Sequence, residues 1–191
     1  PGGLLDTAVK VSQRFLPPGK LIVSTKGREE SQNSEILSSS RNSYFDIPMV
    51  VLVNEGSASG SEIVAGALKD HKRAIILGSK TFGKGSVQTV IPLTDGSALK
   101  LTTSLYFTPS GESIHNKGIT PDVAVEQMPN GQLAALTKEN IGVQKADEIF
   151  EQIEEGEEKI QDKKTDYKSD NQLMRAVDIL KAIAIYEEKK L

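Results

Sequence analysis

The sequence predicts a mixed α/β fold built around a parallel β-sheet. Residues Pro48 to Val53 form an apolar run that leads into a Gly/Ser-rich turn and then into a helical pattern, Ser59 to Asp70. A second apolar segment, Arg73 to Leu77, follows and ends at Gly78. A strand that is apolar on both faces is typical of a parallel sheet covered by helices. The order strand, helix, strand therefore indicates a right-handed β-α-β unit.

The segments before this unit predict one helix and one strand. Residues Leu4 to Leu16 carry apolar side chains near helical spacing, and the helix should stop at Pro17-Pro18-Gly19. Residues Leu21 to Thr25 read as a short strand. Residues Lys26 to Tyr44 are polar and rich in serine, with no periodicity, so we expect a long loop there.

The segments after the unit predict a hairpin and another strand. Residues Val87 to Leu93 and Ala98 to Phe107 alternate in polarity on either side of Thr94-Asp95-Gly96-Ser97, which is a hairpin signal. A short strand is expected at Val123 to Val125.

The composition changes near Met128. Residues Lys145 to Lys164 are highly charged, although Glu148 to Ile153 is amphipathic, and Asp170 to Lys190 predicts an amphipathic helix with Asp170 as its N-cap. We therefore expect a core at residues 1–127 and a charged connector with C-terminal helices at 128–191. Because the chain starts in a turn, Pro1-Gly2-Gly3, we interpret it as a fragment of a longer protein.

Composition excludes several classes of function. The formal net charge is -3, so no basic surface predicts a nucleic-acid partner. The chain has no cysteine, which removes disulfides, thiolate metal sites and a cysteine nucleophile. Its two histidines argue against a multi-histidine metal site. No apolar run approaches the ~20 residues that span a bilayer.

The turn before the predicted helix is a candidate catalytic site. It would place a hydroxyl at a helix N-terminus, beside unpaired backbone N–H groups and the positive end of the helix dipole. Ser57, Ser59 and Ser61 are the candidate nucleophiles, and Ser59 is favoured because the Gly60 N–H can serve an oxyanion hole. The alternative is structural, because Ser59 to Glu62 also matches a helix capping box.

A lysine between two glycines, Lys84, is the candidate general base. A lysine accepts a proton only as the neutral amine, and desolvation favours that form. Phe82 and Val87 could supply an apolar setting, and the amide of Gln88 could hold the amine by a hydrogen bond. A phosphate-binding loop is disfavoured, because the rest of a P-loop is missing and a strand follows. A solvated turn lysine remains the alternative.

The two histidines are weaker candidates. His71 lies in a charged helix-to-strand turn and is expected to be solvated. His115 is the one histidine that could belong to a catalytic triad.

Together these segments resemble the carboxyl-terminal processing peptidases, or tail-specific proteases, which are Ser-Lys endopeptidases. The resemblance covers Pro1 to about Gln127 in fixed order, with a weaker match at Asp170 to Ala176. The segments that carry it are Pro1 to Leu5, Gly27-Arg28, Val53-Asn54, Ser57 to Ile63, Ala65 to Leu68, Asp70, Arg73-Ala74, Thr81 to Gly85, Val87-Gln88, Leu99 to Thr102, Tyr106, Thr108-Pro109, Gly111, Ile114 and Gly118 to Asp122.

The resemblance implies roles for individual residues. Ser59 matches the nucleophile, Lys84 the general base and Gln88 the residue that positions the lysine. The oxyanion hole would use the N–H of Gly60 and one from the Pro-Gly-Gly turn, either Gly2 or Gly3, with Gly2 favoured. The family more often has alanine or proline at position 60, so the glycine is a departure from its pattern.

The resemblance also implies a fold, partners and a compartment. It implies part of a crotonase/Clp-protease-like β-β-α core, here followed by a C-terminal helical segment, and a PDZ domain in the full-length parent that is absent from this chain. The implied substrates are proteins or peptides with apolar C-termini, cleaved in the bacterial periplasm or cell envelope without a metal or organic cofactor. Because expected neighbouring strands are absent, we also expect self-association.

Two other classes of function are alternatives. One is a non-catalytic protein-interaction module that kept the scaffold, but both Ser59 and Lys84 are present. The other is a crotonase-type acyl-CoA enzyme, which would call for CoA-binding features that the sequence does not show.

Overall fold

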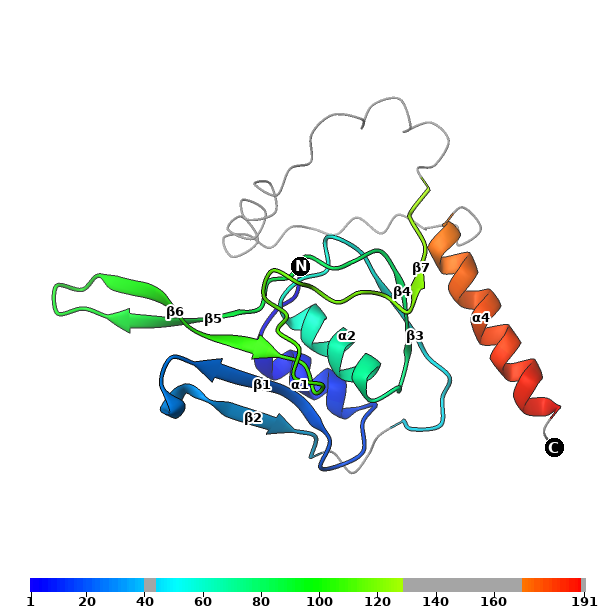
Figure 1. Cartoon of the computed structure of the whole chain (residues 1–191), viewed down its shortest axis with the longest axis horizontal. Helices are drawn as coiled ribbons and strands as arrows, with labels where there is room; N and C mark the ends of the chain where they lie inside the picture. The colour runs from blue at the N-terminus through cyan, green and yellow to red at the C-terminus, as the bar shows by residue number, and fades with distance from the viewer. Residues whose placement is uncertain (40–43, 129–169, 190–191) are drawn as a thin grey trace. The chain divides into compact units, whose positions relative to one another are not determined.

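The computed structural model describes residues 1–39, 44–128 and 170–189, and Figure 1 shows the chain in sequence colours. The chain divides into two compact units, Pro1–Ala124 and Val125–Leu191. Within the described ranges, no helix combines the length and apolar character needed to cross a membrane.

The first unit contains two β-sheets. One is antiparallel with strand order β2-β1-β6-β5, formed by β1 (Leu21–Gly27), β2 (Ser34–Leu37), β5 (Ser86–Pro92) and β6 (Ala98–Phe107). The other is parallel with order β3-β4-β7, formed by β3 (Val50–Val53), β4 (Ile75–Gly78) and β7 (Val123–Ala124). The chain is therefore a mixed α/β protein, as the sequence predicts.

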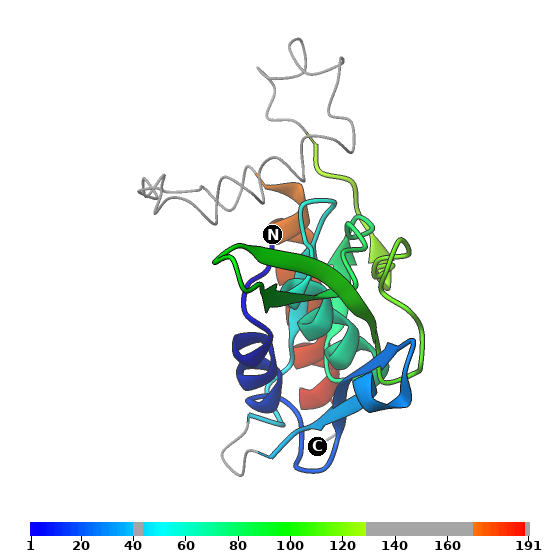
Figure 2. The ribbon, with the colours of Figure 1, turned by 90° about the vertical axis from the view of Figure 1, so that its left-hand side faces the viewer.

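Two helices of this unit, α1 (Leu5–Gln13) and α2 (Gly60–Asp70), build the core with the sheets. Helix α2 lies between the two sheets, with α1 beside it (Figures 1 and 2). The core gathers buried side chains from both helices, both sheets and the segment after β6, namely Ala8, Val9, Leu16, Ile22, Val23, Val53, Ile63, Ala65, Ala67, Leu68, Ile76, Tyr106, Ile114 and Ile119. Helix α2 is thus fixed on several sides, and so is its N-terminal end.

The β-α-β unit is confirmed. Strands β3 and β4 pair in parallel, with Val50 opposite Ile75 and Val53 opposite Gly78. Strand β3 lies at the edge of its sheet, however, and Leu52 is 41% exposed. The expectation that both faces of this strand are covered is therefore wrong at Leu52.

The long loop expected from Lys26 to Tyr44 is also wrong in part. Strand β1 continues to Gly27, a 3-10 turn η1 (Glu30–Gln32) follows, and β2 pairs antiparallel with β1. The Thr25 hydroxyl lies 3.0 Å from the Ser34 hydroxyl and donates to the Gln32 carbonyl. Polar cross-strand contacts hold β2 in place, so its sequence has no apolar periodicity that would predict a strand.

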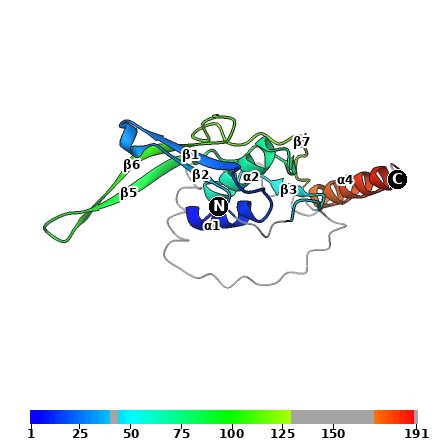
Figure 3. The same ribbon diagram turned by 90° about the horizontal axis from the view of Figure 1, so that it is seen from below.

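The predicted hairpin is formed by β5 and β6, and it extends away from the helices (Figures 1 and 3). At its tip, the N–H and hydroxyl of Ser97 both donate to the Asp95 carboxylate, and they lower the pKa of that carboxyl. Several large apolar side chains of the hairpin region are exposed, namely Val90, Ile91, Leu93, Leu99 and Leu101.

The second unit contains helix α4 (Asn171–Glu188). As predicted, Asp170 is its N-cap, and its side chain accepts hydrogen bonds from the backbone N–H groups of Gln172 and Leu173. The Asn171 side chain donates to the Glu126 carbonyl and accepts from the Met128 N–H. The expected charged connector, including the amphipathic stretch at 148–153, lies outside the described residues.

Candidate active site

Ser59 has a backbone conformation that non-glycine residues rarely adopt. It stands between β3 and α2 as the N-cap of the helix, with φ 51° and ψ −118°. Holding such a residue in this region costs on the order of 1–3 kcal/mol, and residues of this kind cluster at active sites. A strained serine in a sharp turn from strand to helix is also the arrangement that exposes a nucleophilic hydroxyl.

The other two candidate serines have different surroundings. The Ser57 hydroxyl accepts a hydrogen bond from the Asn54 N–H at 3.1 Å, so it closes the turn that follows β3. Ser61 lies within the first turn of α2 and lines a cavity between the two helices. Of the three, Ser59 alone has the strained backbone.

The Pro-Gly-Gly turn at the start of the chain packs against the Ser59 turn. Gly2 has φ 101°, and a Cβ at this position would lie 2.5 Å from the Ala58 carbonyl oxygen and 2.9 Å from the Gly60 nitrogen. This approach is therefore open only to glycine. Gly3 also borders Gly60, since a Cβ on Gly60 would meet the Gly3 nitrogen at 3.3 Å. The choice between Gly2 and Gly3 as the second oxyanion donor stays a prediction.

The loop that carries Lys84 is fixed by backbone hydrogen bonds on both sides. The Phe82 N–H donates to the Ser57 carbonyl at 3.0 Å, which joins this loop to the serine turn. The Gly85 carbonyl accepts from the Tyr106 N–H at 2.7 Å. A Cβ on Gly85 would lie only 2.3 Å from the backbone nitrogen of His115, so the glycine lets the Lys84 loop cross close to the segment that carries His115. Lys84 itself is half-buried.

A buried carboxylate, that of Glu62, joins the two segments. The Glu62 side chain is fully buried, at 0% exposure. Its Oε2 accepts from the backbone N–H groups of Ser59 and Lys84, each at 2.9 Å. Those two nitrogens are therefore separated by no more than the sum of these distances. Its Oε1 accepts from the Thr81 hydroxyl at 2.5 Å and the Gly83 N–H at 2.7 Å.

These four hydrogen bonds explain how a carboxylate is accommodated in the interior. A buried charge is costly unless it is paired or hydrogen-bonded, and Glu62 also lies in the first turn of α2, where the helix dipole favours a negative charge. The capping box identifies the bond to Ser59 from sequence. The bonds to Thr81, Gly83 and Lys84 have no sequence signal, because they join positions about 20 residues away.

Gln88 and the two histidines are not among the residues that Glu62 joins. Gln88 lies exposed on β5, next to a shift in the pairing register with β6, and its role in positioning Lys84 stays a prediction. Nδ1 of His115 is a buried nitrogen with no hydrogen-bond partner among the described residues. The expectation of a solvated His71 is wrong, because its Nε2 lies 2.7 Å from the Leu21 carbonyl oxygen.

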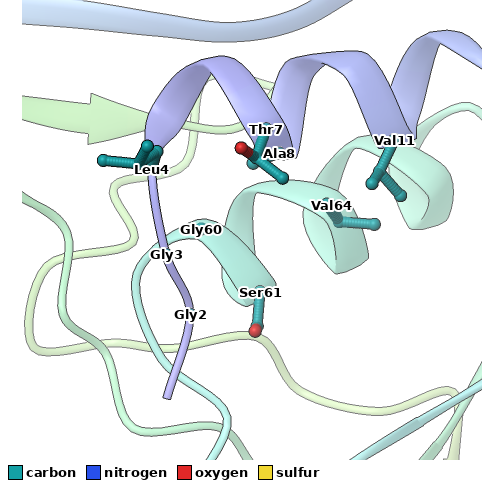
Figure 4. A pocket seen from close by; sticks show the side chains of 9 residues that line it. All are labelled: Gly2, Gly3, Leu4, Thr7, Ala8, Val11, Gly60, Ser61 and Val64. Atoms are coloured by element: carbon teal, nitrogen blue, oxygen red, sulfur yellow. The ribbon is translucent and has the colours of Figure 1, made fainter. Parts of the chain in front are cut away.

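A cavity of about 180 Å³ opens beside this turn, between α1 and α2 (Figure 4). It is lined by nine residues, Gly2, Gly3, Leu4, Thr7, Ala8, Val11, Gly60, Ser61 and Val64. Gly2, Gly3 and Gly60 thus border both the serine turn and the cavity. In the described residues, no group of three or more His, Cys, Asp or Glu side chains is placed to hold a metal ion.

Comparison with known proteins places this arrangement in a family. The model of peptidase family S41 matches residues 1–125. This chain belongs to peptidase family S41. It is 56% identical over 127 residues to a carboxy-terminal-processing protease of Bartonella bacilliformis, covering 66% of this chain and 29% of that protein. It is 47% identical over 126 residues to a probable CtpA-like serine protease of Staphylococcus aureus, covering 66% of this chain and 25% of that protein.

A solved structure supports the same assignment. The photosystem II D1 C-terminal processing protease matches this S41 chain with a TM-score of 0.60 and 43% identity, over 65% of this chain and 32% of that one. The S41 chain thus spans between a quarter and a third of the length of these relatives. Residues 126–191 lie beyond the family match.

Proposed function

We propose that this chain carries the nucleophile and the general base of a Ser-Lys endopeptidase that cleaves protein substrates near apolar C-terminal tails. The observation that carries the proposal is the strained backbone of Ser59 beside Gly60, at the N-terminus of a helix. Membership of the S41 family supplies the class of reaction. The proposal also includes a crotonase- and Clp-protease-like fold for the core of the domain.

The proposed reaction is acyl transfer in two stages. Neutral Lys84 takes the proton of the Ser59 hydroxyl, and the serine oxygen attacks the peptide carbonyl. The Gly60 N–H and an N–H of the Pro-Gly-Gly turn stabilise the negative charge that develops on the carbonyl oxygen. Lys84 then gives its proton to the leaving amine. Water, activated by Lys84, releases the acyl group from Ser59.

The geometry favours catalysis over a non-catalytic interaction module. A module has no use for a serine held at φ 51°, where the backbone conformation costs free energy and glycine would serve better. The shared contacts of Glu62 likewise tie the Ser59 turn to the Lys84 loop, which a binding surface elsewhere on the fold does not need.

The test is covalent trapping of the full-length protein with a fluorophosphonate. We expect one serine to be labelled, with the label on Ser59 in the digested protein. Ser59→Ala should remove labelling, while Ser57→Ala should retain it. A protein that folds but is never labelled, and that cleaves no peptide, would overturn the proposal in favour of an interaction module.

The proposal for the whole protein includes a PDZ domain that captures the substrate's C-terminal carboxylate by strand addition, in the bacterial periplasm or cell envelope. A matched peptide pair tests tail recognition. We expect a peptide ending in alanine with a free carboxylate to be cleaved faster than the same peptide ending in aspartate. Equal rates would contradict a preference for apolar tails.

A further inference from the structure

Lys84 is the central residue of a three-residue turn that closes on one carbonyl. The Gly83 carbonyl accepts a hydrogen bond from the Gly85 N–H at 3.2 Å, which is the bond of a γ-turn. Lys84 is not among the residues with positive φ, so the turn has the common inverse form. The backbone dihedrals of the central residue set the direction of its Cα–Cβ bond. The Gly83 carbonyl therefore governs the direction in which the Lys84 side chain leaves the backbone.

The same carbonyl accepts a second hydrogen bond, from a distant segment of the chain. The Asn116 N–H donates to the Gly83 oxygen at 2.9 Å, which is shorter than the bond from Gly85 within the turn. A peptide oxygen has two lone pairs, so it can accept both bonds. Asn116 follows β6 and is more than 30 residues away in sequence. The γ-turn thus closes on a carbonyl that another segment holds in place.

Three glycines let these two segments pack backbone against backbone. A Cβ on Gly83 would lie 3.0 Å from the Gly118 nitrogen, and a Cβ on Gly85 would lie 2.3 Å from the His115 nitrogen. In the other direction, a Cβ on Gly118 would lie 2.4 Å from the Thr81 carbonyl oxygen. Because no side chain separates the two backbones, a change in the conformation of one is passed directly to the other.

The backbone of Asn116 has a left-handed conformation, with φ 59°. It lies in a turn that the Gly118 N–H closes by donating to the Ile114 carbonyl at 2.9 Å, and the Ile114 side chain is buried in the core. The Asn116 side chain, in contrast, is exposed. Asparagine and glycine tolerate left-handed φ values, whereas a β-branched residue is an outlier there. The structural requirement at position 116 is therefore a backbone conformation that directs an N–H at Gly83.

The peptide group between Gly83 and Lys84 is consequently held at both of its polar atoms. Its N–H, which belongs to Lys84, donates to the buried Glu62 carboxylate at 2.9 Å. Its carbonyl, which belongs to Gly83, accepts from Asn116. The N–H and C=O of a trans peptide lie in one plane and point in opposite directions. Two bonds on opposite edges therefore fix the orientation of that plane, and neither bond alone does so.

We infer that Asn116 is a positioning residue for Lys84, because its left-handed backbone holds the carbonyl on which the Lys84 turn closes. The inference rests on the proposed roles of Ser59 and Lys84. Without the bond from Asn116, the peptide before Lys84 keeps its bond to Glu62 but can rotate about it. The amine of Lys84 then leaves the place from which it takes the proton of Ser59.

The test is a series of substitutions at position 116 in the full-length protein. Glycine, alanine and valine adopt a left-handed φ with increasing difficulty. Asn116→Gly should keep the native kcat for a peptide substrate, and Asn116→Ala should lower it. Asn116→Val should lower kcat by about 10- to 100-fold, since a misplacement of about 1 Å has an effect of this size. KM should stay near its native value, because the change acts on the base and not on substrate binding.

The matched control is the same series at Lys72, which also has a left-handed backbone, with φ 53°. Lys72 is exposed and follows the C-terminal end of α2, whereas Glu62 lies in the first turn of that helix. Lys72→Val should therefore lower the melting temperature about as much as Asn116→Val but leave kcat unchanged. All rates are measured well below the melting temperatures, so that loss of folded protein does not enter.

Labelling of Ser59 by a fluorophosphonate in the unmodified protein separates the two proposals. If Ser59 is labelled, but the variants at 116 lose no more kcat than those at Lys72, the role of Asn116 is wrong and the proposed function stands. A rise in KM at unchanged kcat would also overturn it, because the turn would then act on substrate binding. If Asn116→Val does not fold, the less strained Asn116→Ala decides. A native protein that is neither labelled nor active on peptides would refute both proposals.

Discussion

The carboxylate of Glu62 accepts a hydrogen bond from the backbone N–H of Lys84 at 2.9 Å. Glu62 belongs to the first turn of α2, whereas Lys84 belongs to the loop before β5, so this contact joins two elements that are distant in sequence. The same carboxylate oxygen also accepts from the Ser59 N–H. A fully buried acidic side chain therefore fixes the backbones of the proposed nucleophile and the proposed base relative to each other.

The first prediction concerns the choice of serine. Ser59→Ala should reduce kcat by at least about a thousandfold while the protein stays folded, because the reacting hydroxyl is removed and the loss of the N-cap side chain costs only about 0.5–2 kcal/mol. Peptide cleavage and a thermal melt provide the two measurements. Ser57→Ala and Ser61→Ala are the controls. Full activity in Ser59→Ala together with loss in either control would show that a different hydroxyl reacts.

The second prediction separates a base from a positive charge at position 84. Arginine stays protonated in proteins, so Lys84→Arg keeps the charge but cannot accept a proton. We expect Lys84→Arg to be as inactive as Lys84→Ala in a peptide cleavage assay. An arginine variant with most of the native activity would indicate a contact to substrate instead.

The third prediction concerns the buried carboxylate. Glu62→Gln keeps the shape but replaces one acceptor oxygen by a donor NH₂ group, which cannot satisfy two of the four N–H and O–H groups that point at Glu62. We expect unfolding to become easier by about 1–3 kcal/mol and kcat to fall. Denaturant titration and peptide cleavage measure these effects.

Thr81→Val is the matched comparison for Glu62→Gln. It removes the hydroxyl that donates to Glu62 and accepts from the Ile119 N–H, but leaves the bonds from the Ser59 and Lys84 N–H groups to Glu62 in place. It should therefore lower stability with a smaller effect on kcat. Equal losses of kcat in the two variants would mean that Glu62 acts on overall stability and not on the position of the catalytic backbones.

The fourth prediction compares two neighbouring glycines. A Cβ at Gly2 would lie 2.5 Å from the Ala58 carbonyl oxygen, whereas a Cβ at Gly3 would meet nothing within 4 Å. Gly2→Ala should displace the turn from Gly60 and lower kcat by about 10²–10³-fold, as for the loss of an oxyanion donor. Gly3→Ala should retain activity. The rate of fluorophosphonate labelling is measured in both variants. Similar rates in Gly2→Ala and Gly3→Ala would contradict the close approach of Gly2 to the Ser59 turn.

The fifth prediction concerns the isolated 191-residue chain. Strand β3 is an edge strand with Leu52 exposed, and an exposed apolar edge is a template for pairing with another chain. We expect a dimer or larger species by light scattering. Leu52→Lys should shift the distribution toward the monomer, because a charge on an edge strand opposes pairing. A monodisperse monomer of the unmodified chain would rule out self-association.

Much of the fold can be predicted from local patterns. The β-α-β unit follows from two apolar strands around an amphipathic helix, and the helix that begins at Asn171 follows from the capping preference of Asp170. Strand β2 could not be predicted, because Ser34 to Leu37 is short, mostly exposed and held by polar partners. An edge strand of this kind has no alternation in polarity for a sequence pattern to detect.

The candidate site shows the same division. The turn at Ser59 is predictable because glycines and serines follow an apolar strand directly. The bridge from Glu62 to Lys84 is not, since it depends on how the loop before β5 crosses the end of α2. The cavity is equally invisible in the sequence, because its walls come from helices about 50 residues apart and each wall is an ordinary apolar face.

At Ser59, the backbone conformation that exposes the proposed nucleophile also lowers the stability of the folded chain. At φ 51° and ψ −118° the folded chain would accommodate glycine more easily than any residue with a side chain. Glycine is also nearly as good as serine at a helix N-cap. Ser59→Gly would therefore relieve the backbone strain and exchange the proposed nucleophile for a better-folded, inactive protein.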